Sequence, residues 1–350
     1  MQHRKIVVAG GGTAGHIEPA MAVAEALRER GFDVVALGTN RGLETTIVPE
    51  RGFELALIQP VPVPRKLNMD LVRLPLRVWK AMRQSRQVLK DADVLIGFGG
   101  YVAAPAYIAA RSLRMPMLVH EANARAGMAN KLGVWLGGMG LNAAPDSGMK
   151  GEVVGIPIRN MEDPEAKDRA VELWGLDPEK PVVLVTGGSQ GAASINSAVA
   201  EGLDRVLDQG IQVLHSYGKK NEAPASREGY VPVPYIEDMA AAYAIASLVV
   251  CRAGAMTVAE NTAAGVPAVY VPLPHGNGEQ GLNALQVVQA GGAQLVEDQD
   301  FDGTAFADYV TGILGDDSLR ASMAKQTQES VGANAAEHIA DMVLHITNED

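Results

Sequence analysis

The sequence predicts an α/β protein with two doubly wound, Rossmann-like domains facing a cleft, and three observations support this prediction. Short, continuously apolar runs alternate with alanine-rich stretches of helical spacing, which is typical of buried parallel strands joined by helices. The strand–turn–helix pattern of residues 5–27 recurs at residues 181–203, where Gly187–Gly191 matches Gly11–Gly15. The 350 residues also suffice for two domains of ordinary size.

The elements follow from the same patterning. The strands are expected at the β-branched apolar runs 5–9, 32–37, 93–98, 116–121, 181–186, 212–217, 247–252 and 267–273. The polar, proline-containing segment Gly155–Gly175 is expected to hold the domain boundary. We therefore predict an N-terminal domain at 1–158, a C-terminal domain at 159–330, and a helix at 331–350 that packs back towards the N-terminal domain.

Composition narrows the class of protein. With 47% hydrophobic and 20% charged residues, the chain has the composition of a soluble globular protein. Cys251 is the only cysteine, which excludes an intramolecular disulfide and favours a reducing compartment. No stretch approaches the roughly 20 apolar residues of a membrane span, and the first apolar run is too short for a signal peptide. A cytoplasmic location is expected.

The charge is unevenly distributed. The net charge of -11 argues against nucleic acid as a partner. Between Arg65 and Lys90, however, basic residues greatly outnumber acidic ones and are mixed with apolar ones. Such a segment fits an interfacial helix on an anionic membrane. It equally fits an amphipathic helix that packs on its own domain. Pro75 is expected to divide the segment into a loop and a helix.

Four glycine loops follow predicted strands. The first satisfies G-x-G-x-x-G at Gly10, Gly12 and Gly15, but the second strand ends in Gly38-Thr39-Asn40 without the acid that binds a dinucleotide ribose. The loops lie at 10–15, 97–105, 186–192 and 252–260. Backbone amides and helix N-termini at such loops bind phosphate, and the carboxyl ends of the strands would bring the loops together. The alternative is a set of tight turns chosen for packing.

Two polar side chains near these loops are candidates for chemistry. Glu260 could accept hydrogen bonds from vicinal ribose hydroxyls, or it could simply complement its helix dipole. His16 could act as a general base or phosphate ligand, or it could be a polar neighbour of the helix start. The histidines and the cysteine show no metal-binding spacing. We expect no metal and no cofactor.

Jointly, the motifs resemble the MurG family, the inverting GT-B glycosyltransferases of peptidoglycan synthesis. The matching stretches are "GGTAGH", "GFGGYVAAP", "HEANARAGMANK", "GIPIR", "GGSQGA", "YIEDMAAAYAIASLVVCRAGAMTVAE" and "GEQGLNA", in the family's order. The resemblance implies transfer of N-acetylglucosamine from UDP-N-acetylglucosamine to the muramyl 4-hydroxyl of an undecaprenyl-linked lipid acceptor. It also implies peripheral attachment to an anionic membrane surface, at the cytoplasmic face.

The resemblance also implies roles for individual residues. Ile236 would contact the edge of the uracil base. Glu260 would bind the ribose hydroxyls, and Ser189 would contact the diphosphate. Arg159 would also bind the donor, and Asn123 and Gln280 would hold its sugar. Further donor contacts would come from the residues at the start of one helix: Ala255, Met256, Thr257, Val258 and Ala259. The cleft would be lined by Thr13, Ala14 and Gly15, with Gly12, Tyr101 and Glu121 on the acceptor side and His16 as the base. Membrane contacts would come from Arg73, Arg77, Trp79, Lys80 and Arg83.

Three other functions compete with this interpretation. A different GT-B enzyme could move a UDP-sugar to another lipid. A nicotinamide oxidoreductase is disfavoured by Gly38-Thr39-Asn40. A non-catalytic membrane-docking module would leave the clustered glycine loops without a purpose.

Overall fold

The fold was examined in a computed structural model, which describes residues 4–40, 42–61, 69–159, 163–188, 190–274, 279–330 and 334–348. The described residues form two compact units. The first comprises the residues up to 159 together with 334–348, and the second comprises 163–330. Each unit has its own sheet and its own hydrophobic core.

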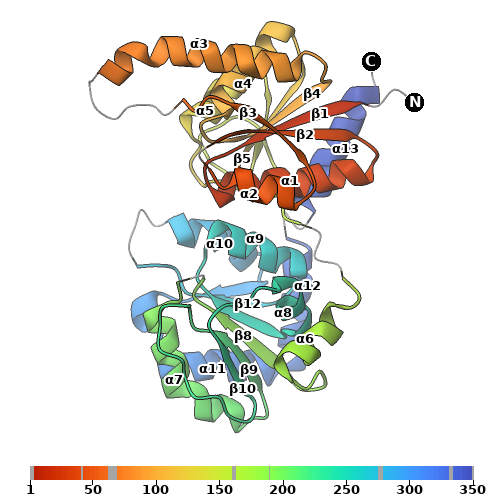
Figure 1. The fold of residues 1–350 in the computed structure, drawn as a ribbon. Coiled ribbons are helices and arrows are strands. Elements are labelled where there is room, and N and C mark those ends of the chain that lie inside the picture. The colour runs from red at the N-terminus through yellow and green to blue at the C-terminus, as the bar shows by residue number, and fades with distance from the viewer. Residues whose placement is uncertain are drawn as a thin grey trace. The chain divides into compact units, whose positions relative to one another are not determined.

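The first unit contains a parallel sheet with strand order β3-β2-β1-β4-β5-β6-β7 (Figure 1). Its strands are β1 (Lys5–Gly10), β2 (Asp33–Thr39), β3 (Glu54–Ile58), β4 (Val94–Gly99), β5 (Met117–Glu121), β6 (Met139–Asn142) and β7 (Glu152–Val153). Its helices are α1 (Ala14–Glu29), α2 (Glu44–Glu50), α3 (Met69–Leu89), α4 (Ala103–Leu113), α5 (Met128–Trp135) and α13 (Ala335–Asn348).

Alternate side chains along each strand belong to different hydrophobic layers, one on each face of this sheet. Ile6 and Val8 of β1 belong to the layer that includes α1 and α13, whereas Val7 and Ala9 belong to the layer that includes α3 and α4. Successive strand side chains point to opposite faces. A strand covered on both faces must therefore be continuously apolar, which is the pattern seen in the sequence.

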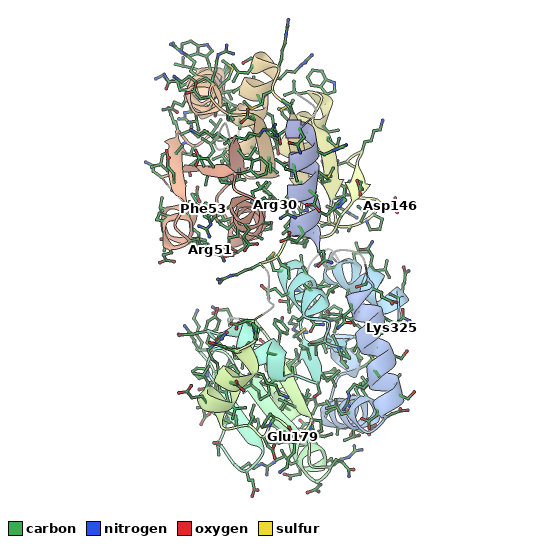
Figure 2. All side chains as sticks on the ribbon, turned by 90° about the vertical axis from the view of Figure 1, so that its right-hand side faces the viewer. Arg30, Arg51, Phe53, Asp146, Glu179 and Lys325 are labelled. Carbon is green, nitrogen blue, oxygen red and sulfur yellow. The ribbon has the colours of Figure 1, made fainter. Side chains whose placement is uncertain are left out.

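The last helix, α13, packs against α1, and Arg30 joins the two (Figure 2). One Arg30 amino group lies 2.6 Å from Glu337 Oε2 and the other lies 2.6 Å from Asp341 Oδ1. Burial works to lower the pKa of Arg30, but hydrogen bonds from the guanidinium to Asp341 and Glu337 outweigh it and raise the pKa. The C-terminal helix is thereby part of the first unit.

The second unit contains a parallel sheet with strand order β10-β9-β8-β11-β12-β13. Its strands are β8 (Val182–Thr186), β9 (Gln212–Ser216), β10 (Tyr230–Val233), β11 (Leu248–Cys251), β12 (Ala268–Tyr270) and β13 (Ala293–Leu295). Its helices are α6 (Ala166–Trp174), α7 (Ala193–Leu207), α8 (Met239–Ile245), α9 (Ala255–Ala264), α10 (Glu279–Gln289), α11 (Gly303–Leu314) and α12 (Asp317–Gln328), with a 3₁₀ turn η1 (Asp298–Asp300). One face packs on α7 and α11 and the other on α6, α8, α9 and α10.

The prediction of two doubly wound, Rossmann-like domains is confirmed, and each of the eight predicted runs contains a strand. The prediction for Pro75 is wrong, because α3 begins at Met69 and continues through this proline. A proline removes one backbone hydrogen bond from a helix interior. Here Leu74 and Val78, on either side of Pro75, pack into the core, so tertiary packing stabilises the helix despite that loss.

Candidate active site

The first unit brings two glycine loops together at the point where its strand order reverses. Strands β1 and β4 are neighbours, so the loop Gly10–Thr13 lies beside the loop Gly99–Tyr101. Gly100 has a φ of +82°, and a Cβ atom there would lie 2.2 Å from the Gly11 carbonyl oxygen. Only glycine permits both this backbone conformation and this close approach. Ligands of doubly wound sheets bind at such switch points.

His16 lies in the first turn of α1, half-buried between the two loops. Its Nδ1 is 3.2 Å from the Thr13 hydroxyl. Its Nε2 and Cδ2 face Gly99, where a Cβ atom would lie 3.3 Å from either. Tyr101 is 54% exposed, with its ring against Gly12. The structure therefore brings together Gly12, Thr13, His16 and Tyr101, which the sequence predicted to share one site.

The Glu121 carboxylate is buried and fully engaged by its own loop. Oε1 accepts hydrogen bonds from the backbone and the side-chain amide of Asn123, at 2.9 and 2.7 Å. Oε2 accepts from the Gly127 amide and the Asn130 side chain, both at 2.9 Å. Gly127 is the N-cap of α5, where a negative charge is favourable. Glu121 thus holds the loop that presents Asn123.

Arg159 is at the end of the first unit's main segment, beside α1. Its Nε lies 3.8 Å from Glu25 Oε2, and its side chain is 71% exposed. Glu25 is also contacted by Arg51, so it is shared between two guanidinium groups. A contact of this length to an exposed guanidinium contributes little to stability. The Arg159 side chain is therefore open to a ligand on this surface.

The second unit repeats the arrangement at its own switch point between β8 and β11. The loop after β8 packs tightly on the loop after β9, since a Cβ atom at Gly191 would lie 2.1 Å from the Tyr217 carbonyl oxygen. The Asn221 side chain donates hydrogen bonds to the carbonyl oxygens of Gln190 and Tyr217. Ser189, predicted to contact the diphosphate, lies outside the described residues.

The predicted donor residues Ala255, Met256, Thr257, Val258, Ala259 and Glu260 form the first turns of α9. The N-cap Gly254 provides no side-chain cap, so amides of the first turn are available to a ligand. Glu260 is half-buried. Burial, and then the nearby Glu260 carboxylate, raise the pKa of the Cys251 thiol.

Two further donor candidates flank α9. Ile236, in the segment between β10 and α8, is 3% exposed and shares a core cluster with Val258 of α9. The Gln280 side chain of α10 accepts a hydrogen bond from the Leu273 amide at 2.9 Å. The neighbouring Asn283 donates to the Ala253 carbonyl oxygen at 3.1 Å. α10 is thereby attached to the loop that opens α9.

Sequence reasoning missed Arg252, which connects the two loops of the second switch point. Its guanidinium pairs with Asp298 and donates to Ser194 Oγ at 2.9 Å. It also donates to the carbonyl oxygens of Val271 and Pro272, both at 3.1 Å. A charged residue directly after an apolar strand is the signal that could have identified it. Its partner Asp298 is 46 positions away in the chain.

The basic helix α3 has two distinct faces. Ala81, Ser85 and Leu89 are buried against the domain. On the other side Leu76 is 55% and Trp79 48% exposed, with Lys80 and Arg83 exposed beside them. The Arg83 guanidinium stacks over the Trp79 ring at 4.9 Å. One face of α3 therefore packs on its own domain, and the other presents exposed apolar and basic side chains to solvent.

Two other predicted membrane contacts differ from this set. Arg77 on α3 is half-buried and has an interaction within the protein. Arg73 belongs to α3, but its side chain is outside the described part, as is the side chain of Ala14 in the first loop.

Within the described ranges, none of the helices is both long and apolar enough to cross a membrane. The same ranges contain no cluster of three metal-ligating side chains.

Two Rossmann-like units, each with glycine loops at its switch point, have the architecture of the GT-B glycosyltransferases. The N-terminal domain model of glycosyltransferase family 28 matches residues 6–137, and the C-terminal domain model of that family matches residues 182–340. The chain belongs to glycosyltransferase family 28.

Relatives cover the whole chain. A Corynebacterium diphtheriae protein named UDP-N-acetylglucosamine–N-acetylmuramyl-(pentapeptide) pyrophosphoryl-undecaprenol N-acetylglucosamine transferase is 66% identical over 99% of this chain and 98% of its own. A protein of the same name from Mycolicibacterium smegmatis is 52% identical, covering 97% of this chain and 94% of its own. The crystal structure of Acinetobacter baumannii MurG is 30% identical, with a TM-score of 0.70 over 98% of this chain and 99% of that one.

Proposed function

We propose that this enzyme transfers N-acetylglucosamine from UDP-N-acetylglucosamine to the muramyl 4-hydroxyl of undecaprenyl-pyrophosphoryl-N-acetylmuramyl-pentapeptide. The product is the β-1,4-linked disaccharide lipid used in peptidoglycan synthesis. One observation carries the proposal: relatives with 52% and 66% identity, matched over nearly their full length, are named for this transfer. The matched lengths, 99% and 97% of this chain, include nearly all of the loops described above.

In this proposal the second unit holds the donor. The exposed amides at the start of α9 and the glycine turn after β8 would bind the diphosphate, and Glu260 would accept hydrogen bonds from the ribose hydroxyls. Ile236 would present its backbone to the uracil, and Gln280 would contact the sugar. Asn123 and Arg159, which belong to the first unit, would make further donor contacts. The leaving diphosphate gains negative charge as the glycosidic bond breaks. Fixed amides can stabilise that charge without reorganisation.

The first unit would supply the acceptor side and the base. The acceptor hydroxyl attacks the anomeric carbon from the face opposite UDP, which inverts the configuration. The hydroxyl proton must leave during the attack, and His16 would take it. Thr13, in contact with Nδ1, would fix the orientation of the imidazole ring. Gly12, Gly15 and Tyr101 would line the acceptor pocket.

A nicotinamide function has no support in the first loop. Gly12 is the second glycine of the pattern, which must approach a dinucleotide pyrophosphate. Its amide already donates a hydrogen bond of 3.1 Å to the Glu44 carboxylate. A pyrophosphate there would meet a negative charge. The loop is built differently from a dinucleotide site.

Calorimetric titration with UDP, UDP-N-acetylglucosamine, UDP-glucose and NAD tests the donor assignment. We expect UDP and UDP-N-acetylglucosamine to bind, and Glu260→Ala to weaken UDP binding by about 2 kcal/mol, or roughly thirtyfold, because two hydrogen bonds to a charged acceptor are lost. Glu172→Ala on exposed α6 is the matched control. Preference for UDP-glucose would favour a different transferase, and unchanged affinity in Glu260→Ala would refute the ribose assignment.

We further propose that α3 docks the enzyme on the cytoplasmic face of an anionic membrane, as a peripheral protein. Leu76 and Trp79 would enter the headgroup region, and Lys80 and Arg83 would meet lipid phosphates. Each cation near such a surface contributes about 1 kcal/mol. This arrangement would bring the enzyme to its lipid-linked acceptor.

Reversal of charge on α3 is expected to weaken this docking. The double variant Lys80→Glu/Arg83→Glu should lose most of its co-sedimentation with phosphatidylglycerol vesicles, because attraction is replaced by repulsion. Lys167→Glu/Lys325→Glu makes the same change of net charge at exposed sites of the second unit and should sediment like the wild type. Equal loss in both variants would show that only net charge matters, which contradicts docking by α3.

A further inference from the structure

The first unit contains a buried carboxylate, that of Glu44, which has no role in the site described above. This residue begins α2, directly after the turn that follows β2, and its side chain is 0% exposed. Oε2 accepts a hydrogen bond from the Gly12 amide at 3.1 Å. Oε1 accepts two from Thr39, from the amide and from the hydroxyl, both at 2.9 Å. A carboxylate buried this deeply normally has a structural or functional reason.

Three glycines leave room for this side chain. A Cβ atom would lie 1.8 Å from Glu44 Oε2 at Gly42, 2.8 Å from Glu44 Cγ at Gly38, and 3.0 Å from Oε1 at Gly11. Any side chain at Gly42 or Gly38 would thus displace the carboxylate. In the sequence pattern G-T-x-x-G-x-E at positions 38–44, the two glycines therefore leave space for the Glu44 carboxylate, and Thr39 donates hydrogen bonds to it.

The environment keeps the carboxylate charged. Burial works to raise its pKa, but hydrogen bonds from backbone amides, including that of Gly12, and from the Thr39 hydroxyl outweigh burial and hold the pKa below its ordinary value. Hydrogen bonds to an ionised acceptor are the strong ones. Glu44 therefore holds the Gly12 amide firmly.

The loop is fixed from the opposite side by the β4 loop. The Gly11 carbonyl oxygen abuts Gly100, and His16 faces Gly99. Glu44 and these two glycines thus fix the backbone on both sides of the segment that leads into Thr13 and His16. A misplacement of about 1 Å at reacting groups can cost roughly a hundredfold in rate.

We propose that Glu44 is a positioning residue for the transfer reaction, holding the first glycine loop so that Thr13 and His16 present the imidazole to the acceptor hydroxyl. This inference rests on the proposed function. Glu44 would make no contact with substrate, because its carboxylate acts through the hydrogen bond to Gly12.

The test compares Glu44→Gln and Gly42→Ala with Glu50→Gln. Glu44→Gln keeps the shape but turns one acceptor into a donor that faces an N–H group. Gly42→Ala leaves Glu44 intact and pushes Oε2 away. Glu50, exposed at the other end of α2, is the matched control. We expect kcat per UDP-binding site to fall about tenfold to a hundredfold in the first two variants, with the dissociation constant of UDP unchanged.

Nuclear magnetic resonance provides a second readout that does not depend on turnover. The Gly12 amide proton should move upfield in Glu44→Gln and Gly42→Ala and stay in place in Glu50→Gln. A lower melting temperature combined with wild-type kcat per UDP-binding site would overturn the proposal and leave Glu44 a stabilising role only. If one of these variants does not fold, Thr39→Val takes its place and is judged by the same criteria, because it removes the hydrogen bond from the Thr39 hydroxyl to Glu44. Absence of transfer by the wild type would instead defeat the proposed function, and the resonance shifts would still report on Glu44.

Discussion

Replacing His16 with alanine is expected to lower kcat by about 10²- to 10⁴-fold, the usual contribution of a positioned general base. The affinity for UDP should stay close to that of the wild type. The reason is that His16 lies in the first turn of α1, in the first unit, while the expected nucleotide contacts at α9 belong to the second unit. Steady-state kinetics with a lipid-linked acceptor and calorimetry with UDP measure the two quantities separately.

Two controls separate a base from a purely structural residue. Thr13→Val removes the hydroxyl 3.2 Å from His16 Nδ1 but leaves the imidazole, so it should cost about tenfold in kcat. Added imidazole should restore part of the activity of His16→Ala and none of that of Thr13→Val. Near-normal turnover in His16→Ala would exclude His16 as the base.

Acidification from pH 6.5 to pH 4 is expected to destabilise both units markedly. Burial lowers the pKa of His120 in the first unit and of His215 in the second from 6.5 to about 4. Between these values the unfolded chain binds protons that the folded chain does not, so protonation favours unfolding. The stabilising contribution is therefore complete above pH 6.5 and is lost as the pH falls towards 4. A pKa difference of this size corresponds to roughly 3 kcal/mol for each imidazole.

Both rings are held as neutral groups inside their units. His120 Nε2 lies 2.8 Å from the Gly155 carbonyl oxygen, which ties β5 to the segment after β7. His215 Nδ1 lies 2.8 Å from the Tyr230 hydroxyl, and its Nε2 lies 3.1 Å from Asn196 Oδ1. In both residues these contacts fit a neutral imidazole ring, in which only one of the two nitrogens carries a proton. A charged ring would also have to give up its solvation.

Hydrogen exchange at several pH values can report on each unit separately, through peptides from β5 and β9. His120→Gln should flatten the pH dependence of the opening free energy in β5 peptides and leave β9 peptides unchanged. The same substitution at half-exposed His338 serves as the control. An equally steep pH dependence of β5 in His120→Gln would show that other groups cause the acid sensitivity.

Much of the architecture could be predicted because it rests on local patterning. Continuously apolar runs identify strands buried on two faces, and the eight runs found in the sequence are all strands. The five that were missed are β3, β6, β7, β10 and β13, which are short or partly exposed. In β3, for example, the apolar run covers only residues 55–58, and Glu54 and Leu57 are exposed, so the strand lacks the long, continuously buried pattern of the central strands.

The candidate site could be predicted only in part. Glycine loops at strand ends are visible in the sequence, and the structure places Gly12, Thr13, His16 and Tyr101 together. The partners of charged groups were not visible. The sequence did not show that the carboxylates of Glu44 and Glu121 are buried, because burial depends on the backbone amides that the fold brings to them.

The sequence by itself determined the two parallel sheets, the glycine turns at their centres and the family, since each depends on residues close together in the chain. Tertiary structure alone decided that α3 passes through Pro75, that Arg252 joins the loops of the second switch point, and that α13 is tied to α1 by Arg30. These outcomes depend on packing and ion pairs between distant segments. Their energies outweigh local preferences and leave no local trace in the sequence.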